Sequence, residues 1–269
     1  MIPVRDSGDD LALEIVENRA QGFLPLACVA TVGTTSMTSI DPVPAIGEIC
    51  RREQVWLHVD GAYGGVLAIA PELRYILDGV EGADSLVVNP HKWLFTPFDC
   101  SAFYIKRPEI LKRAFSLVPE YLVTREQDEV VNYMDYGVQL GRRFRALKLW
   151  MVIRAFGTDG LAERLREHCA LARELAGWIE SSDDWQLVAP VPFALVCLRY
   201  APPGTSDAEC DRLTERIMHA VNDEGEVFLS HTKLNDRFTL RMSIGNIRTE
   251  RKHVALAWQK LNEAAASAK

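Results

Sequence analysis

Short apolar runs alternate with helical patterns over roughly the first hundred residues of the chain. Between the apolar runs Leu24–Val32 and Val55–Asp60, the segment Pro44–Gln54 carries apolar residues at the spacing of one helix face. The runs are five to nine residues long, rich in Val, and end in turn residues, which predicts strands buried on both faces. A strand, a helix and a second parallel strand is the arrangement of an α/β fold. The four runs are Leu24–Val32, Val55–Asp60, Ser85–Asn89 and Phe98–Ile105.

The pattern changes in the second half of the chain. Phe144–Glu180 has the spacing of a long helix, with an interruption near Gly157–Gly160. A few strands with helices packed on one face then predict a small α+β domain. We therefore expect two domains, residues 1–155 and residues 156–269. The predicted strands of the second are Phe193–Tyr200, Val227–Ser230 and Phe238–Ile244, and its helices are Ala208–Asn222 and Thr249–Ala265.

Composition and charge narrow the class of protein. The 269 residues are 48% hydrophobic and 25% charged, which is ordinary for a soluble globular protein. With 30 basic and 37 acidic residues the net charge is −7, which disfavours nucleic acids and anionic membranes as partners. We also expect no membrane span and no secretory signal. The six cysteines form no C-x-x-C pair, so we expect no metal site and a reducing, cytoplasmic setting.

Two ionisable residues follow predicted strands, where α/β proteins bind their ligands. Lys92 lies in the pentapeptide Asn89-Pro90-His91-Lys92-Trp93. Asp60 precedes a turn with Gly61, Gly64 and Gly65, which we expect to leave room for a ligand to approach the backbone. Each has a structural alternative: Lys92 as a surface lysine on a turn, and Asp60 as a helix cap. Together they match the needs of a pyridoxal phosphate enzyme. A desolvated lysine binds the cofactor aldehyde as a Schiff base, and a carboxylate keeps the pyridine nitrogen protonated.

The ordered motifs around these residues resemble the group II pyridoxal-phosphate-dependent amino acid decarboxylases, and within that group the aromatic-L-amino-acid decarboxylases. The resemblance implies an aspartate-aminotransferase-like (fold type I) large domain, of which residues 1–155 would be the C-terminal part. The motifs are Thr31-Val32-Gly33-Thr34-Thr35, Ile40-Asp41-Pro42, Trp56-Leu57-His58-Val59-Asp60-Gly61-Ala62-Tyr63-Gly64, Asn89-Pro90-His91-Lys92-Trp93, Phe98-Asp99-Cys100-Ser101-Ala102, Pro119-Glu120-Tyr121-Leu122 and Leu140-Gly141-Arg142-Arg143-Phe144-Arg145.

The resemblance also implies a role for each residue of the cofactor site. Lys92 would form the Schiff base with pyridoxal 5'-phosphate, Asp60 would pair with its ring nitrogen, and Ala62 would pack beneath the ring. The other implied contacts are Thr31 at the first strand end, and Asn89 and His91 on the phosphate and Schiff-base side.

Tyr121 distinguishes two activities within the resembled family. It would lie on a mobile loop and protonate the substrate α-carbon after carbon dioxide leaves. Related aldehyde synthases typically carry Phe at this position, so Tyr121 favours decarboxylation of an L-amino acid, an aromatic one by overall resemblance, to the amine. An aldehyde synthase on the same fold is the alternative.

The chain departs from the resembled family in length. The family's enzymes carry roughly two hundred more residues before the position that matches Met1, by usual domain sizes. We therefore expect a truncated chain that exposes apolar sheet surface, holds the cofactor from one side, and is weak or inactive alone. The full-length form would be a homodimer. A non-catalytic fragment or pseudoenzyme subunit is a further alternative.

Overall fold

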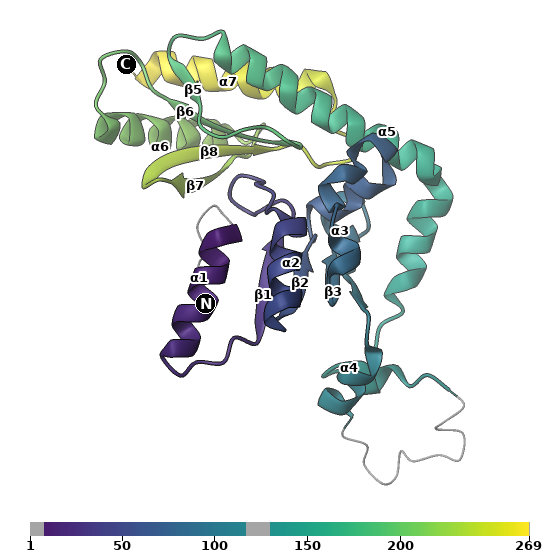
Figure 1. The fold of residues 1–269 in the computed structure, drawn as a ribbon. Coiled ribbons are helices and arrows are strands. Elements are labelled where there is room, and N and C mark those ends of the chain that lie inside the picture. The colour runs from purple at the N-terminus through teal and green to yellow at the C-terminus, as the bar shows by residue number, and fades with distance from the viewer. Residues whose placement is uncertain (1–7, 117–129, 269) are drawn as a thin grey trace.

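The computed structural model describes residues 8–116 and 130–268, and this part of the chain contains two four-stranded sheets (Figure 1). The first sheet has the order β1-β2-β3-β4. Its first three strands are parallel and the fourth is antiparallel to β3, so the predicted α/β arrangement is confirmed. The strands are β1 (Ala27–Thr31), β2 (Trp56–Asp60), β3 (Ser85–Val88) and β4 (Ala102–Ile105).

Helices and single turns connect these strands. Helix α2 (Val43–Glu53) fills the predicted crossover between β1 and β2. Helix α1 precedes β1 and was not predicted. The other helical segments of this half are α1 (Gly8–Ala20), η1 (Gly64–Ile69), η2 (Pro71–Leu77), η3 (Val80–Gly82), α3 (Pro90–Trp93), α4 (Pro108–Phe115) and η5 (Tyr133–Tyr136).

The two outer strands of the first sheet correct the expectation of burial on both faces. Val29 on β1 is 52% exposed and Phe103 on β4 is 50% exposed. Successive side chains of a strand point to opposite faces. On β4 the next residue, Tyr104, is 59% exposed as well, so both faces of this strand are uncovered. The expectation was wrong because continuous apolar runs do not reveal whether both faces are covered within the chain. The first sheet therefore has the exposed apolar surface that the resemblance led us to expect.

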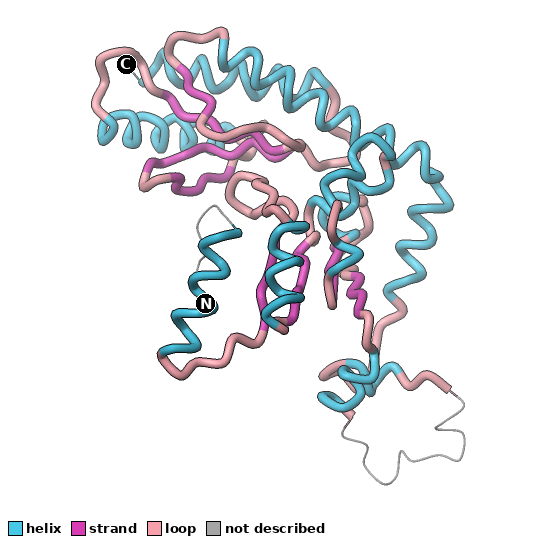
Figure 2. Tube along the Cα trace, in the orientation of Figure 1, coloured by secondary structure: helices cyan, strands magenta, loops and turns pink. Residues whose placement is uncertain are grey.

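The second sheet is antiparallel throughout and has the order β5-β6-β8-β7. All six residues of β6 are buried. In the view of Figures 1 and 2, helix α7 (Arg251–Ala268) and the later part of helix α5 (Arg145–Glu180) lie along one side of this sheet. The elements are α5 (Arg145–Glu180), β5 (Trp185–Leu187), β6 (Leu195–Tyr200), α6 (Asp207–Glu224), β7 (Ser230–Leu234), β8 (Arg237–Ser243) and α7 (Arg251–Ala268).

The hairpin of β7 and β8 lies further along the chain than its predicted first strand, Val227–Ser230. The turn consists of Asn235 and Asp236, both with positive φ, of 50° and 62°. Two left-handed residues make the turn whose twist suits a two-residue hairpin, and Asn and Asp tolerate that conformation. The prediction placed the strand too early because the alternation of β7 is weak, whereas the turn fixes the register.

Helix α5 joins the two halves of the molecule and bends where the sequence predicts an interruption. Gly157 has φ 67° and ψ 168°, a backbone conformation that favours glycine. The bend lies beside the expected boundary at residue 155, and the division into two domains stays a prediction.

In the parts of the chain that the structure describes, every helix is too short or too polar to cross a membrane.

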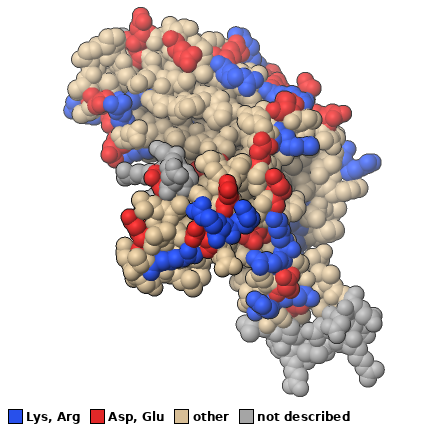
Figure 3. Space-filling view, viewed as in Figure 1, with Lys and Arg blue, Asp and Glu red and all other residues tan. Residues whose placement is uncertain are grey.

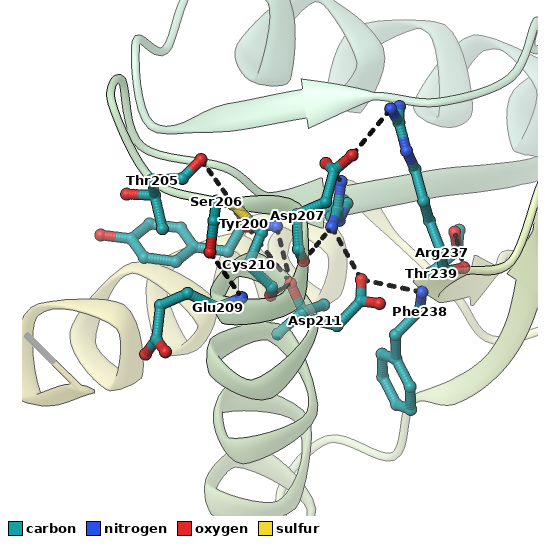
Figure 4. Close-up of polar contacts among 12 residues, drawn as sticks. Tyr200, Thr205, Ser206, Asp207, Glu209, Cys210, Asp211, Arg237, Phe238 and Thr239 are labelled. Atoms are coloured by element: carbon teal, nitrogen blue, oxygen red, sulfur yellow. Dashed lines mark hydrogen bonds and ion pairs between the residues drawn. The ribbon is translucent and has the colours of Figure 1, made fainter.

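A buried arginine network holds the strand β6 to the start of α6 (Figure 4). The Arg199 guanidinium is 1% exposed and donates to Asp207 Oδ1 at 2.8 Å and to Asp211 Oδ1 at 2.7 Å. Asp211 also accepts a hydrogen bond from the backbone N–H of Phe238 on β8. One carboxylate therefore connects the helix with two strands of the second sheet.

Candidate functional site

The predicted site residues lie at the carboxyl ends of the parallel strands. Thr31, the last residue of β1, is in register with Asp60, the last residue of β2, and Asp60 is in register with Val87 of β3. Neighbouring strands are about 4.8 Å apart, so these strand ends form one continuous edge. Lys92 follows on the short helix α3, directly after β3. The edge is where α/β sheets bind ligands.

Asp60 is held by the turn that follows it. Its Oδ1 accepts a hydrogen bond from the backbone N–H of Ala62 at 3.0 Å, while Ala62 itself is buried. Its side chain does not cap η1, so the helix-cap alternative is wrong. In the described ranges, the other carboxylate oxygen has no hydrogen-bond or ion-pair partner. Asp60 is half-buried, so this oxygen can serve as an acceptor at the sheet edge.

The glycines after Asp60 serve close packing within the protein. A Cβ at Gly64 would lie 2.7 Å from the carbonyl oxygen of Val32, and one at Gly65 would lie 2.8 Å from Cγ2 of Val88. Real Cβ atoms do not approach other atoms so closely, so only glycine lets η1 press against the ends of β1 and β3. The sequence suggested room for an approaching ligand, but the chain itself fills that room.

The turn that carries Lys92 is hydrogen-bonded to the turn that carries Asp60. The backbone N–H of Asn89 donates to the carbonyl of Ala62 at 3.2 Å, and the N–H of Lys92 donates to the carbonyl of Asn89 at 2.9 Å. The Lys92 side chain is exposed and forms no ion pair with any described residue. The unpaired amine of Lys92 and the Asp60 carboxylate, of which one oxygen has no described partner, thus lie on adjoining turns.

Asn89 and His91 are both engaged by the segment before β4. Asn89 Oδ1 accepts from the Ser101 hydroxyl at 2.6 Å. Nδ1 of His91 lies 2.7 Å from the carbonyl oxygen and 3.0 Å from the backbone nitrogen of Cys100. These contacts fix both side chains beside Lys92. Their predicted roles toward a cofactor stay predictions, as does that of Thr31, whose backbone N–H donates to Asp41 Oδ2 at 2.7 Å.

Asp99 connects the same segment to the start of α5. It lies 3.1 Å from Arg145 Nε and 3.6 Å from Arg143 Nη1. Partial burial alone would raise the pKa of Asp99, but the hydrogen bond from Arg145 and the nearby positive charges outweigh it and lower the pKa. Asp99 therefore stays ionised and keeps the segment on the helix.

Three aromatic rings behind Lys92 were not predicted as part of the site. Trp93 is fully buried and stacks on Tyr63, with ring centroids 4.8 Å apart and planes 4° apart. Its indole N–H donates to Nδ1 of His168 on α5 at 3.0 Å. In the sequence, His168 is a lone histidine with no partner at metal-ligand spacing. Only the fold brings residues 75 positions apart together.

Tyr121, the predicted proton donor, lies outside the described residues. Its role therefore stays a prediction from the sequence. Within the described residues, no cluster of three or more His, Cys, Asp or Glu side chains is placed to hold a metal ion.

Comparison with known proteins identifies the family. The family model described as the pyridoxal-dependent decarboxylase conserved domain matches residues 1–201, about three quarters of the chain. The chain belongs to this family. The predicted resemblance is thereby confirmed.

Individual members of the pyridoxal-dependent decarboxylase family are similar over nearly the whole chain. Tryptophan decarboxylase 2 of Oryza sativa subsp. japonica is 43% identical over 249 residues, which cover 91% of this chain and 50% of that protein. Phenylacetaldehyde synthase of Arabidopsis thaliana is 42% identical over 246 residues, with 91% and 50% covered. The crystal structure of Oryza sativa TDC with PLP and tryptamine superposes with a TM-score of 0.93 at 35% identity, covering 97% of this chain and 55% of that one.

These comparisons confirm the fold that the sequence predicts. The fold is the fold type I, aspartate-aminotransferase-like architecture expected from the sequence, with an α/β region followed by an α+β region. The chain spans about half the length of the curated relatives it matches.

The residues at the sheet edge fit pyridoxal phosphate, the cofactor of this family. Lys92 supplies a primary amine without a competing carboxylate among the described residues, but its side chain is exposed and not desolvated as the sequence led us to expect. Asp60 supplies a carboxylate oxygen that its own turn leaves available. The two come from adjoining turns that share a backbone hydrogen bond. This donor set suits one aldehyde and one ring nitrogen of the same small molecule.

Proposed function

We propose that this chain carries the lysine- and aspartate-bearing part of a decarboxylase site that acts on an aromatic L-amino acid. The observation that carries the proposal is the amine of Lys92 on the turn next to that of Asp60, at the carboxyl edge of a fold type I sheet. The names of similar proteins, such as tryptophan decarboxylase 2, support the aromatic substrate class.

Pyridoxal phosphate, when bound, supplies an electron-accepting ring conjugated to the α-carbon of the substrate. Lys92 would hold the cofactor through its amine and release it to the amine of the substrate. Asp60 would accept a hydrogen bond from the protonated ring nitrogen and keep its proton in place. Ala62 would form the floor under the ring, and Thr31, Asn89 and His91 would line the cofactor.

Tyr121 would donate the proton that the α-carbon needs once carbon dioxide has left. A phenol can deliver a proton, which favours an amine product. Formation of an aldehyde is the second candidate, and the 42% identity to phenylacetaldehyde synthase supports it. Analysis of the product as amine or aldehyde separates the two.

Assembly and location belong to the same proposal. Exposed apolar side chains on the first sheet support a homodimer of the full-length form, in which this surface is covered.

The six free cysteines support a cytoplasmic location. Acidic and basic side chains are interspersed on the face shown in Figure 3, in keeping with a small-molecule substrate as the partner. We infer weak cofactor binding by the 269-residue chain alone, because the Lys92 side chain is exposed.

A cofactor titration tests the proposal. Adding pyridoxal phosphate to the chain should produce the visible absorbance of a lysine-bound cofactor, and Lys92→Ala should abolish it. Lys106→Ala, at another exposed lysine that follows a strand, is the matched control and should leave the absorbance unchanged. Equal absorbance in the wild type and Lys92→Ala would refute the proposal. With aromatic L-amino acids, any turnover should yield the amine and depend on Lys92.

A further inference from the structure

The aromatic rings behind Lys92 form a column that crosses three parts of the fold. Tyr63 lies on the turn after Asp60, Trp93 directly follows Lys92, and His168 lies on α5. Trp93 and His168 are both fully buried, with 0% of either side chain exposed. The column therefore links the two turns of the proposed site to the helix that supports the second sheet.

The contacts in this column are directional. The rings of Tyr63 and Trp93 are parallel at 4.8 Å, and those of Trp93 and His168 are parallel within 8° and joined by the 3.0 Å hydrogen bond. Phe95 closes the column with its ring perpendicular to that of His168 at 5.7 Å. Stacking fixes the tilt of the indole, and the hydrogen bond fixes its rotation in its own plane.

The hydrogen bond also determines the state of the histidine. The indole N–H can only donate, so Nδ1 of His168 must accept and the ring must be neutral with its proton on Nε2. Burial lowers the pKa of His168, which keeps this neutral form at pH 7. Removing the acceptor would leave a buried indole N–H without a partner.

We propose that His168 is a positioning residue for Lys92, acting through Trp93. Helix α3 has only four residues, so the orientation of Trp93 determines where the neighbouring Lys92 amine points relative to Asp60. The inference rests on the proposed function, because it concerns the lysine that would bind the cofactor.

Reductive trapping tests the inference without requiring turnover. The full 269-residue chain is mixed with pyridoxal phosphate and reduced with borohydride, and peptide mass spectrometry measures the pyridoxyl group on Lys92 relative to Lys106. His168→Phe keeps an aromatic ring but removes the acceptor. We expect it to lower the selectivity for Lys92 about tenfold, the size of the penalty for an unsatisfied buried donor. His168→Asn places an amide oxygen near the Nδ1 position and should restore most of the selectivity.

Trp185→Phe is the matched control. It removes another buried indole hydrogen bond, the 3.1 Å contact from Trp185 to Asn262 in the second half of the molecule. It should lower the unfolding temperature without changing the labelling of Lys92. An equal loss of selectivity in Trp185→Phe and His168→Phe would overturn the inference, because general destabilisation would then explain both.

The outcomes separate the two proposals. Selective labelling of Lys92 in the wild type that persists in folded His168→Phe overturns the positioning role and leaves the proposed function intact. Labelling spread over all lysines in the wild type overturns both. If His168→Phe does not fold, His168→Asn decides: wild-type selectivity supports the role, and a loss in this folded variant overturns it.

Discussion

The side chains of the second sheet are more deeply buried than those of the first sheet. In the second sheet, every residue of β6 is buried and a fully buried arginine is paired with two carboxylates. In the first sheet, both outer strands carry half-exposed apolar side chains, such as Val29 and Phe103. The predicted reactive groups that the structure describes, Lys92 and Asp60, lie on the first sheet and its turns. The buried side chains of the two halves form one continuous hydrophobic core, but only the first half presents chemistry on an incompletely covered sheet.

The two sheets contribute differently to stability and to function. Burial of apolar area is the dominant favourable term in folding, so the second sheet should dominate the free energy of unfolding. The first sheet depends on its neighbours. Arg241 of β8 donates to the carbonyls of Thr35 and Ser36 in the loop after β1, at 2.6 and 3.1 Å. The site is therefore supported from the better-packed half.

Loss of a carboxylate from the arginine network should have the largest effect on stability. Asp211→Ala removes an acceptor from both Arg199 and the Phe238 backbone N–H, and leaves a buried charge undercompensated. We expect a loss of about 3 kcal/mol in denaturant unfolding. The comparison variant is Glu72→Ala, which breaks the exposed pair with Arg166 and should cost less than about 1 kcal/mol. Similar losses in both variants would contradict the contrast.

A matched pair of valines tests the contrast in apolar burial. Val196 on β6 is fully buried, and Val29 on β1 is half-exposed. Val196→Ala should lower the free energy of unfolding by about 2 kcal/mol, because it removes two buried methyl groups. Val29→Ala should change it by less than about 0.5 kcal/mol. An equal or larger effect at Val29 would mean that the outer strand is covered in solution, for example by a second copy of the chain.

The link between the halves can be loosened at Arg241. Arg241→Met keeps the apolar stem but removes the hydrogen bonds to Thr35, Ser36 and Ser230. We expect a loss of about 1 kcal/mol and faster hydrogen exchange at the amides of residues 34–39. Exchange in β6 should stay unchanged. Unaltered exchange in the loop would show that Arg241 does not hold it.

The smallest predicted effect is a pH dependence of stability from His168. Burial lowers its pKa below the ordinary value of about 6.5, against the opposing charge of Glu167 and with that of nearby Arg164. The unfolded chain then binds more protons, so this contribution to stability is complete above pH 6.5. It is lost as the pH falls from there through the lowered pKa. The wild type should lose stability in that window relative to His168→Asn, whose side chain does not titrate. Parallel pH curves would contradict the burial argument.

The sequence predicts well what depends on local patterns. The strands around Asp60 and before Lys92, the crossover helix and the bend at Gly157 all follow from periodicity and glycine placement. The ordered motifs also predict the family. These features are local because each is encoded within about ten neighbouring residues.

Other features depend on contacts that a pattern does not contain. The exposure of β1 and β4 depends on what covers them, and β7 was misplaced because its turn, Asn235-Asp236, sets the register. The pairing of Trp93 with His168 joins positions 75 residues apart. The glycines at 64 and 65 were interpreted as space for a ligand, whereas they accommodate Val32 and Val88.

We propose that the Lys92 amine and the Asp60 carboxylate bind opposite ends of one pyridine ring. Nitrogen-15 NMR of ring-labelled pyridoxal phosphate bound to the chain tests it most directly. We expect a protonated ring nitrogen in the wild type and an unprotonated one in Asp60→Asn. The signal of the bound ring nitrogen should be absent in Lys92→Ala. The same ring-nitrogen shift in the wild type and Asp60→Asn would contradict it.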